Sequence, residues 1–268
     1  MINKVILVVL DGLNYQVACQ CMGYLNGLLE QKRSSLYRVQ CELPSMSRPL
    51  YECILTGVRP IESGIVNNDI VRLSNQDSIF SLAKSQGKVT AAAAYHWVSE
   101  LYNRAPFEPR RDRFTHDKTL NIQHACFYQW DNYPDEAVFL DAEQIRLKYQ
   151  PDFLLIHPMN IDDMGHKHGL DSRQYRNCTR HVDIILSHFI EGWLTDGYQI
   201  LITSDHGMNN DCSHGGISPE EREVPLFVIG EHFSHKGCQV LQTDICGTVC
   251  QLLNLEHSKS YTQELLVL

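Results

Sequence analysis

The sequence alternates short apolar runs with longer segments whose apolar residues recur at helical spacing, and this alternation constrains the fold most strongly. Five short runs are apolar enough to be strands buried on both faces of a sheet. They are Val5–Leu10, Lys88–Ala94, Phe153–Ile156, Gln199–Thr203 and Pro225–Ile229. The segments with helical spacing are Ser78–Gln86, Glu136–Tyr149, Arg173–Leu194 and Asp244–Leu253. Strands separated by helices predict an α/β fold with a mostly parallel central sheet and helices on both faces.

The length of the chain, 268 residues, favours one large domain over several small ones. We therefore expect a single domain over residues 1–268. The stretch Tyr102–Asp135 is the least regular part, because it is rich in Arg, Pro, Asn and aromatic residues. Two interpretations of it stay open: a long surface excursion, or a small cap insertion that covers a functional site.

Charge and cysteine content narrow the class of protein. With 23 basic and 32 acidic residues the formal net charge is −9, which argues against a nucleic-acid polymer as partner. A small phosphate ester is not excluded, because a bound metal ion reverses the local charge. The apolar run Val5–Leu10 is too short for a signal-peptide core, and no stretch approaches the ~20 apolar residues of a membrane span. We expect a cytoplasmic protein with no membrane segment and reduced cysteines; an exported, disulfide-bonded protein is the alternative.

Acidic and histidine side chains follow three of the predicted strands. Because ligands bind beyond the carboxyl ends of parallel strands, these residues should meet in one crevice. Carboxylate oxygen and imidazole nitrogen together suit zinc, and with more carboxylate also manganese or iron. Taken singly, each residue also fits a strand-exit turn, a polar helix start or a loop. The candidates are Asp11, Asp162, His166, Asp205, His206 and His214.

A candidate nucleophile lies in the segment 42–68. Ser45 and Ser47 precede Pro49, a residue suited to the first turn of a helix. The helix Tyr51–Thr56 would follow, with Gly57 as its C-terminal stop. A serine at a helix N-terminus faces backbone N–H donors, which favour a phosphate group or an alkoxide. The alternative is that Ser47 only caps the helix.

The order of these motifs resembles the alkaline phosphatase superfamily and, within it, the nucleotide pyrophosphatase/phosphodiesterase family. The similar motifs are Asp11, Ser47-Arg48-Pro49, Thr56-Gly57, Ser63-Gly64-Ile65, Asp162–His166, Ser204–Met208 and His214-Gly215. The resemblance implies a nucleophilic Ser47 and two divalent metal ions, usually zinc. It implies that Asp162, His166 and His214 bind one ion. It also implies that Asp11, Asp205 and His206 bind the other, with the Ser47 hydroxyl bridging toward both.

The substrate pocket is less clear from the resemblance. Where many relatives have Asn three residues after the nucleophile, this chain has Leu50, so this phosphate-oxygen donor is either missing or supplied from elsewhere. Arg48 and Asn68 are candidates; a guanidinium fork fits two phosphate oxygens, although a solvated Arg48 at the helix start is the alternative. Tyr95, His96 and Trp97 lie where relatives place aromatic pocket residues, and either line a leaving-group pocket or pack in the core.

The function implied is metal-dependent hydrolysis of a phosphodiester or pyrophosphate bond in a small molecule. A phosphomonoesterase or a phosphonoacetate hydrolase on the same site is an alternative. A sulfatase fits less well, because Tyr51 stands where the sulfatase motif has Arg and Gly12 follows Asp11. An inactive scaffold is the alternative from another class. A Rossmann dinucleotide enzyme is excluded because no GxGxxG follows Val5–Leu10.

Overall fold

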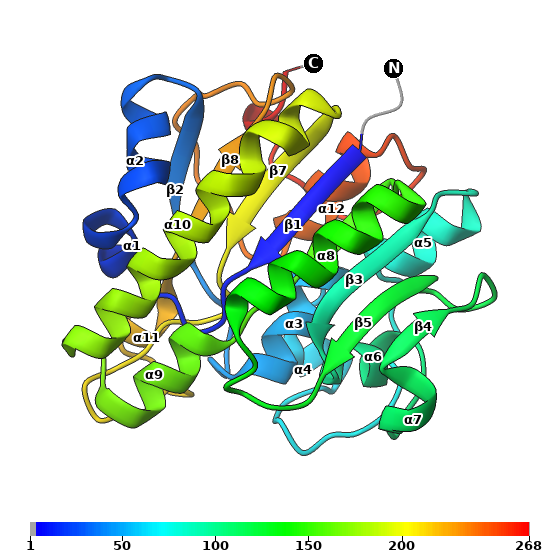
Figure 1. Cartoon of the computed structure of the whole chain (residues 1–268), viewed down its shortest axis with the longest axis horizontal. Helices are drawn as coiled ribbons and strands as arrows, with labels where there is room; N and C mark the ends of the chain where they lie inside the picture. The colour runs from blue at the N-terminus through cyan, green and yellow to red at the C-terminus, as the bar shows by residue number, and fades with distance from the viewer. Residues whose placement is uncertain (1–3, 268) are drawn as a thin grey trace.

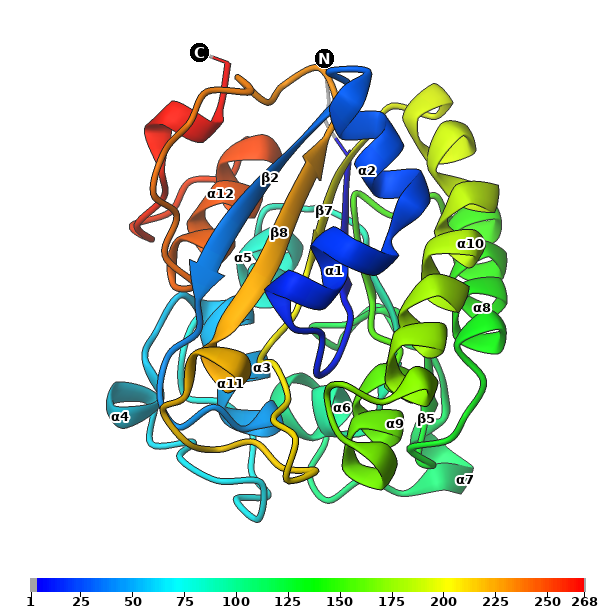
Figure 2. The same cartoon turned by 90° about the vertical axis from the view of Figure 1, so that its left-hand side faces the viewer.

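A computed structural model describes residues 4–267, and the strands of this part form one sheet (Figures 1 and 2). The strand order is β2-β8-β7-β1-β6-β3-β5-β4. The central strands β7, β1, β6, β3 and β5 are parallel to one another, and antiparallel pairs stand at both edges. The expected mostly parallel sheet is confirmed. The strands are β1 (Lys4–Val9), β2 (Ser34–Gln40), β3 (Thr90–Tyr95), β4 (Phe114–His116), β5 (His124–Tyr128), β6 (Phe153–Ile156), β7 (Tyr198–Thr203) and β8 (Glu223–Ile229).

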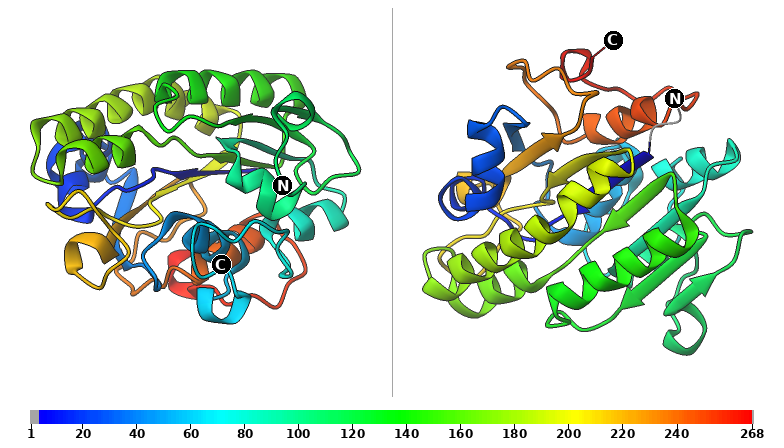
Figure 3. Two further views of the ribbon diagram at one scale, coloured as in Figure 1. Left: turned by 90° about the horizontal axis from the view of Figure 1, so that it is seen from below. Right: turned by 45° about the horizontal axis from the view of Figure 1, so that its top comes forward.

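The central strands are apolar throughout because both faces of the sheet are covered. In β1, Val5 and Leu7 point into one hydrophobic core while Ile6 and Val8 point into the other, and all four are fully buried. Seen from below the sheet, helices form a layer on each side of it (Figure 3). The run Val5–Leu10 is therefore a strand buried on both faces, as its composition predicts.

The first face of the sheet, into which Ile6 and Val8 point, is covered by α1 (Tyr15–Cys21), α2 (Gly23–Glu30), α8 (Asp135–Tyr149) and α10 (Arg173–Thr195). The helix α9 (Asn160–His168) packs beside α10. Helices on the second face include α3 (Ser47–Thr56), α5 (Ile79–Ser85) and α12 (Asp244–Leu252). The short helices are α4 (Pro60–Ser63), α6 (Trp97–Tyr102), α7 (Pro109–Asp112) and α11 (Pro219–Arg222), followed by the 3-10 turn η1 (Gln263–Leu265). The four helices expected from periodicity are present within two residues of the predicted bounds.

Part of the segment 102–135, which the sequence left open as a surface excursion or a cap, joins the sheet. It contains α7 and the two strands β4 and β5, which extend the sheet beyond β3. The strand β5 is fully buried, but His124 and Tyr128 at its two ends hide it in the sequence. The turn after β5, residues 129–134, follows the carboxyl end of that strand, and α7 lies at the same end of the sheet (Figure 1).

Two further properties bear on the expectations drawn from composition. Within residues 4–267, no helix is both long enough and apolar enough to span a membrane. All ten cysteines lie in this described part as free thiols. Six of them are buried, among them Cys246 and Cys250 in the core under α12, which matches the role of small apolar fillers.

Candidate active site

The strands β7, β1 and β6 are neighbours in the sheet, and their carboxyl ends bring the predicted Asp and His residues together. Asp11 follows β1 and Asp205 follows β7, and both are completely buried. Asp162 lies on α9, which begins after β6, and is one helical turn from His166. His214 comes from the loop between β7 and α11. One crevice therefore collects side chains that are up to about 200 residues apart in the chain, as expected for ligands at one edge of a parallel sheet.

The six side chains form two adjoining groups. His206 Nε2 lies 3.2 Å from Asp205 Oδ2 and 3.5 Å from Asp11 Oδ1. In the second group, His166 Nε2 lies 3.1 Å from the Nε2 of His214 and 3.4 Å from an Asp162 oxygen. The groups meet where the rings of His206 and His214 stack at 3.6 Å. The candidate ligand atoms of His206, His214 and Asp162 all lie within 4.8 Å of one another, so His206 borders both groups.

Three buried carboxylate oxygens in this crevice have no hydrogen-bond donor: Asp11 Oδ1, Asp162 Oδ1 and Asp205 Oδ2. Leaving a buried charged oxygen unpaired is costly, so such atoms call for a cation or a proton. Burial, and after it the neighbouring Asp11 carboxylate, raise the pKa of both Asp162 and Asp205 well above the usual range. Bound cations would reverse this repulsion. The donor set therefore fits divalent metal ions.

The histidines of the crevice are oriented as metal ligands usually are. Each has its Nδ1 within hydrogen-bond distance of a backbone carbonyl, so that Nδ1 carries the proton and the lone pair of Nε2 faces the carboxylates. Burial lowers the pKa of His206 and lowers that of His214 to about 3, which keeps both rings neutral. The pairs are His166 with Cys212 (3.0 Å), His206 with Gly207 (2.9 Å) and His214 with Ser45 (2.8 Å).

Ser47 is the first residue of α3 and borders both ligand groups through His206. Its side chain is buried, and its Oγ lies 3.0 Å from His206 Nε2. The helix begins four residues before the predicted Tyr51, with Met46 as its N-cap, so Ser47 does not serve as the cap. Ser45 donates to the Gly216 carbonyl and accepts from a neighbouring N–H of the His214 loop. Ser45 therefore fastens that loop, and Ser47 alone of the two faces the crevice.

The two candidate phosphate donors lie in different surroundings. Arg48 is 1% exposed, and its guanidinium pairs with Glu100 at 2.8 Å and stacks over Trp97 at 4.6 Å. Its two terminal nitrogens thus donate to Glu100 and to the Ile70 carbonyl, which speaks against a role of these groups in holding substrate. Asn68 Oδ1 accepts the backbone N–H of Arg48 at 3.0 Å, so its amide lies against the first turn of α3. Leu50 is completely buried and offers no donor.

The aromatic residues after β3 form a cluster at the same edge of the sheet. The Tyr95 ring lies 4.4 Å from His96 and 5.1 Å from Trp97, and His96 also packs on Phe107 at 5.3 Å. Tyr95 is buried, whereas His96 and Trp97 are half-buried. The cluster combines core packing at Tyr95 with partly accessible side chains at His96 and Trp97, and the leaving-group pocket stays a prediction.

One residue of the crevice was missed by the sequence analysis. His157 is the first residue after β6 and is 1% exposed, with its Nε2 3.1 Å from Asp11 Oδ2. Tyr51 also donates to this oxygen. Although burial opposes the charge on Asp11, the hydrogen bond from His157 and the nearby His206 outweigh it and lower its pKa to about 2. A polar residue directly after a buried apolar strand was the signal that could have identified His157.

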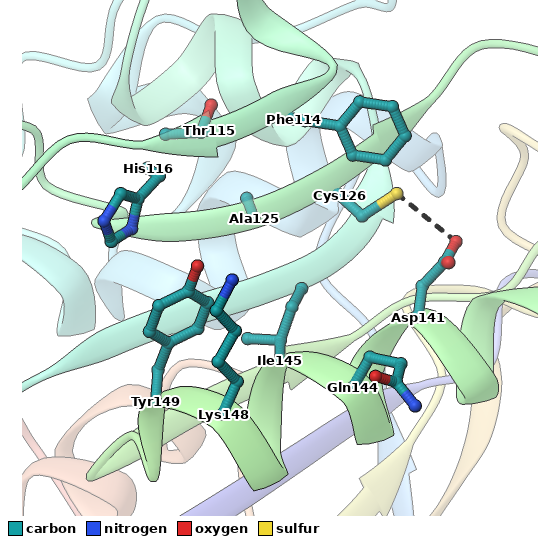
Figure 4. A pocket seen from close by; sticks show the side chains of 10 residues that line it. All are labelled: Phe114, Thr115, His116, Ala125, Cys126, Asp141, Gln144, Ile145, Lys148 and Tyr149. Carbon is teal, nitrogen blue, oxygen red and sulfur yellow. Dashed lines mark hydrogen bonds between the residues drawn. The ribbon is translucent and has the colours of Figure 1, made fainter.

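A separate cavity of about 340 Å³ lies between α8 and the strands β4 and β5 (Figure 4). Its walls include His116, Cys126 and Tyr149, and the thiol of Cys126 donates to Asp141 at 3.3 Å. None of the ten residues that line it is a predicted metal ligand. It is therefore distinct from the Asp/His crevice.

Residues 5–221 match the family model described as type I phosphodiesterase / nucleotide pyrophosphatase. The chain belongs to this family. The type I phosphodiesterase fold is also clear from solved structures. Murine ectonucleotide pyrophosphatase/phosphodiesterase 5 superposes with a TM-score of 0.78 over 98% of this chain and 100% of its own, at 14% identity. A putative sulfatase from Bacteroides thetaiotaomicron gives a TM-score of 0.67 over 96% of this chain and 72% of its own, at 13% identity.

Curated relatives in the same family act in two ways, to judge by their names. GPI ethanolamine phosphate transferase 2 of Candida albicans is 27% identical over 96% of this chain and 31% of its own length. Ectonucleotide pyrophosphatase/phosphodiesterase 2 of Saccharomyces cerevisiae is 26% identical over 83% of this chain and 51% of its own length. The chain thus spans about a third to a half of these relatives. Family membership supports an enzyme that acts on phosphoric esters; the reaction and substrate are taken up below.

Proposed function

We propose that the chain is a metal-dependent phosphoric ester hydrolase in which Ser47 is the nucleophile. The observation that carries this proposal is the position of the Ser47 hydroxyl, which lies 3.0 Å from a histidine of the Asp/His crevice at the start of a helix. Family membership supports the chemistry of phosphoric esters. A phosphodiester or pyrophosphate bond in a small molecule is the proposed substrate.

We assign the crevice to two divalent metal ions, most suitably zinc. Asp162, His166 and His214 would hold one ion, and Asp11, Asp205 and His206 the other. The orphaned carboxylate oxygens and the free Nε2 lone pairs support this donor set. Ions bound there would lower the pKa of the serine hydroxyl and neutralise charge that develops on the phosphate.

Residues of the chain would carry out the nucleophilic attack, bind the phosphate group and contact the leaving group. Ser47 Oγ forms the new bond to phosphorus and loses its proton, while one ester oxygen leaves with the bonding electrons and takes up a proton. The intermediate is a phosphodiester of Ser47 that keeps the second substituent of the substrate, and water then hydrolyses it to free Ser47 and the phosphomonoester product. The amide of Asn68 is anchored beside Ser47 through its Oδ1, which leaves its NH₂ group as the donor for a phosphate oxygen. Asn68 would then supply the phosphate-oxygen donor that relatives have at the position of Leu50. Tyr95 and Trp97 would flank the leaving group.

A second candidate is transfer of the phosphoryl-bearing group to an acceptor alcohol instead of to water. The similarity to GPI ethanolamine phosphate transferase 2 over 96% of this chain favours it. Both reactions begin with the same attack by Ser47, and they differ only in whether water or an alcohol displaces Ser47 from the phosphodiester intermediate. Adding a series of alcohols to the assay distinguishes them, because a transferase yields a new phosphodiester whereas a hydrolase yields only the hydrolysed product.

The test of the proposal is Ser47→Ala assayed on bis(p-nitrophenyl) phosphate, on p-nitrophenyl phosphate and on a dinucleotide pyrophosphate. We expect turnover to be abolished while zinc content stays at the level of the unmodified protein. Stripping metal with a chelator should abolish turnover of the unmodified protein, and zinc or manganese should restore it. Unchanged turnover in Ser47→Ala would refute the nucleophile, and full activity of metal-free protein would refute the metal assignment.

A further inference from the structure

A fourth histidine, His157, is buried beside the crevice, and its hydrogen bonds run opposite to those of His166, His206 and His214. Those three keep the proton on Nδ1 and present a bare Nε2. His157 instead has its Nδ1 facing the backbone N–H of Tyr95 at 3.4 Å. That contact makes Nδ1 an acceptor, so the proton of the neutral ring lies on Nε2.

The protonated Nε2 of His157 faces the inner oxygen of Asp11. Nε2 lies 3.1 Å from Asp11 Oδ2, and the same oxygen also accepts the hydroxyl of Tyr51. The rings of His157 and Tyr51 pack edge-to-face with their centroids 4.5 Å apart, so the two side chains that donate to Oδ2 also hold each other in place. The partner oxygen, Oδ1, is left without a donor and turns toward His206.

We propose that His157 is a positioning residue that fixes the Asp11 carboxylate with Oδ1 toward the ion held by Asp11, Asp205 and His206. The inference rests on the proposed metal site. His157 touches neither that ion nor the substrate in this arrangement; it acts by denying Oδ2 to the ion and by stopping rotation of the carboxylate. Partners of this kind typically change metal affinity by 10–100-fold when they are removed.

The position of His157 is itself held rigidly. The residue is 1% exposed, and its backbone carbonyl accepts the Tyr128 hydroxyl at 2.6 Å while its backbone N–H donates to the Ala93 carbonyl at 2.9 Å. Contacts from β3 and β5 therefore fix the backbone, and the N–H of Tyr95 fixes the ring. This is the pre-organisation that a residue acting through another one needs.

The test compares three substitutions that differ in where they place an N–H donor. The amide of His157→Gln reaches about as far as Nε2, whereas the shorter amide of His157→Asn reaches only as far as Nδ1, and His157→Ala has no donor. Zn²⁺ affinity is measured by chelator competition on full-length protein, and the visible spectrum of bound Co²⁺ is recorded beside it. His188→Ala, an exposed histidine on α10, is the control. Thermal unfolding without metal shows whether each variant is folded, and the Gln and Asn pair carries the test if His157→Ala does not fold.

We expect unmodified protein to bind two Zn²⁺ ions. In His157→Asn and His157→Ala one ion should bind 10–100-fold more weakly and the other should be unaffected, with a changed Co²⁺ spectrum for one site only. His157→Gln should restore most of the lost affinity. Equal affinity in the Asn, Ala and unmodified proteins would overturn the inference and leave the metal site standing. An unmodified protein that binds no Zn²⁺ and hydrolyses no phosphoric ester would overturn the proposed function and the inference together.

Discussion

The buried pair between Arg48 and Glu100 gives a prediction that separates a structural arginine from a substrate-binding one. The two side chains are 1% and 7% exposed and lie 2.8 Å apart. Arg48→Met would leave the Glu100 carboxylate buried without its partner, and breaking a buried pair in this way costs about 3–5 kcal/mol. For a chain of this size each kcal/mol lowers the melting temperature by about 2–4 °C, so we expect a fall of roughly 10 °C.

The matched variants are Glu100→Gln and the double variant Arg48→Met/Glu100→Gln, followed by thermal and denaturant unfolding. Because the second substitution removes the stranded charge, the double variant should be more stable than the sum of the two single losses predicts, with a coupling of about 2 kcal/mol. A 100-fold loss of turnover in Arg48→Met at unchanged stability would refute the structural role and restore Arg48 as a phosphate ligand.

Three further predictions concern single positions. Gly12→Ala should lower the free energy of unfolding and the amount of bound zinc more than Gly87→Ala does. Both glycines have positive φ, but only a Cβ at Gly12 would meet Asp162, at 2.8–2.9 Å. Equal losses of unfolding free energy and of bound zinc in the two variants would contradict this. Asn68→Asp should keep the acceptor for the helix amide but replace the donor with a negative charge, raising KM or lowering kcat by at least ~10-fold at unchanged melting temperature; normal kinetics would exclude the donor role. Burial raises the pKa of Asp135 to about 7. Between pH ~4 and 7 the folded state therefore binds a proton that the unfolded state has released, so the free energy of unfolding should fall as pH rises, by up to about 1.4 kcal/mol per pH unit. Asp135→Asn should remove this fall, and a parallel pH profile in both proteins would show that another group causes it.

The fold could be predicted from the sequence wherever a segment is buried on both faces and is therefore apolar throughout. Val5–Leu10 and Phe153–Ile156 are apolar because they are central strands, and both were predicted. The edge strand β2, Ser34–Gln40, alternates irregularly between buried and exposed residues, so it carries no such pattern. The strand β5 was hidden because its end residue His124 is buried by contacts with His116 and Tyr149, which only the folded chain supplies.

The candidate site shows the same division. Asp162 and His166 could be paired from their spacing, because one helical turn separates them. The partner of Arg48 could not be found in this way, since Glu100 is 52 residues away and meets it only after α3 and α6 pack together. The role of His157 depends on which ring nitrogen is protonated, and a backbone N–H from a neighbouring strand decides that. Spacing along the chain therefore indicated the candidate ligands but not the side chains that contact them.

The measurement that tests the account most directly is anomalous X-ray scattering at the zinc edge from crystals grown with Zn²⁺. We expect two peaks, on either side of Ser47. One lies about 2.0–2.2 Å from atoms of Asp11, Asp205 and His206, and the other at similar distances from Asp162, His166 and His214. A single peak, no peak in the crevice, or zinc bound only at the cavity beside Tyr149 would contradict the two-metal site.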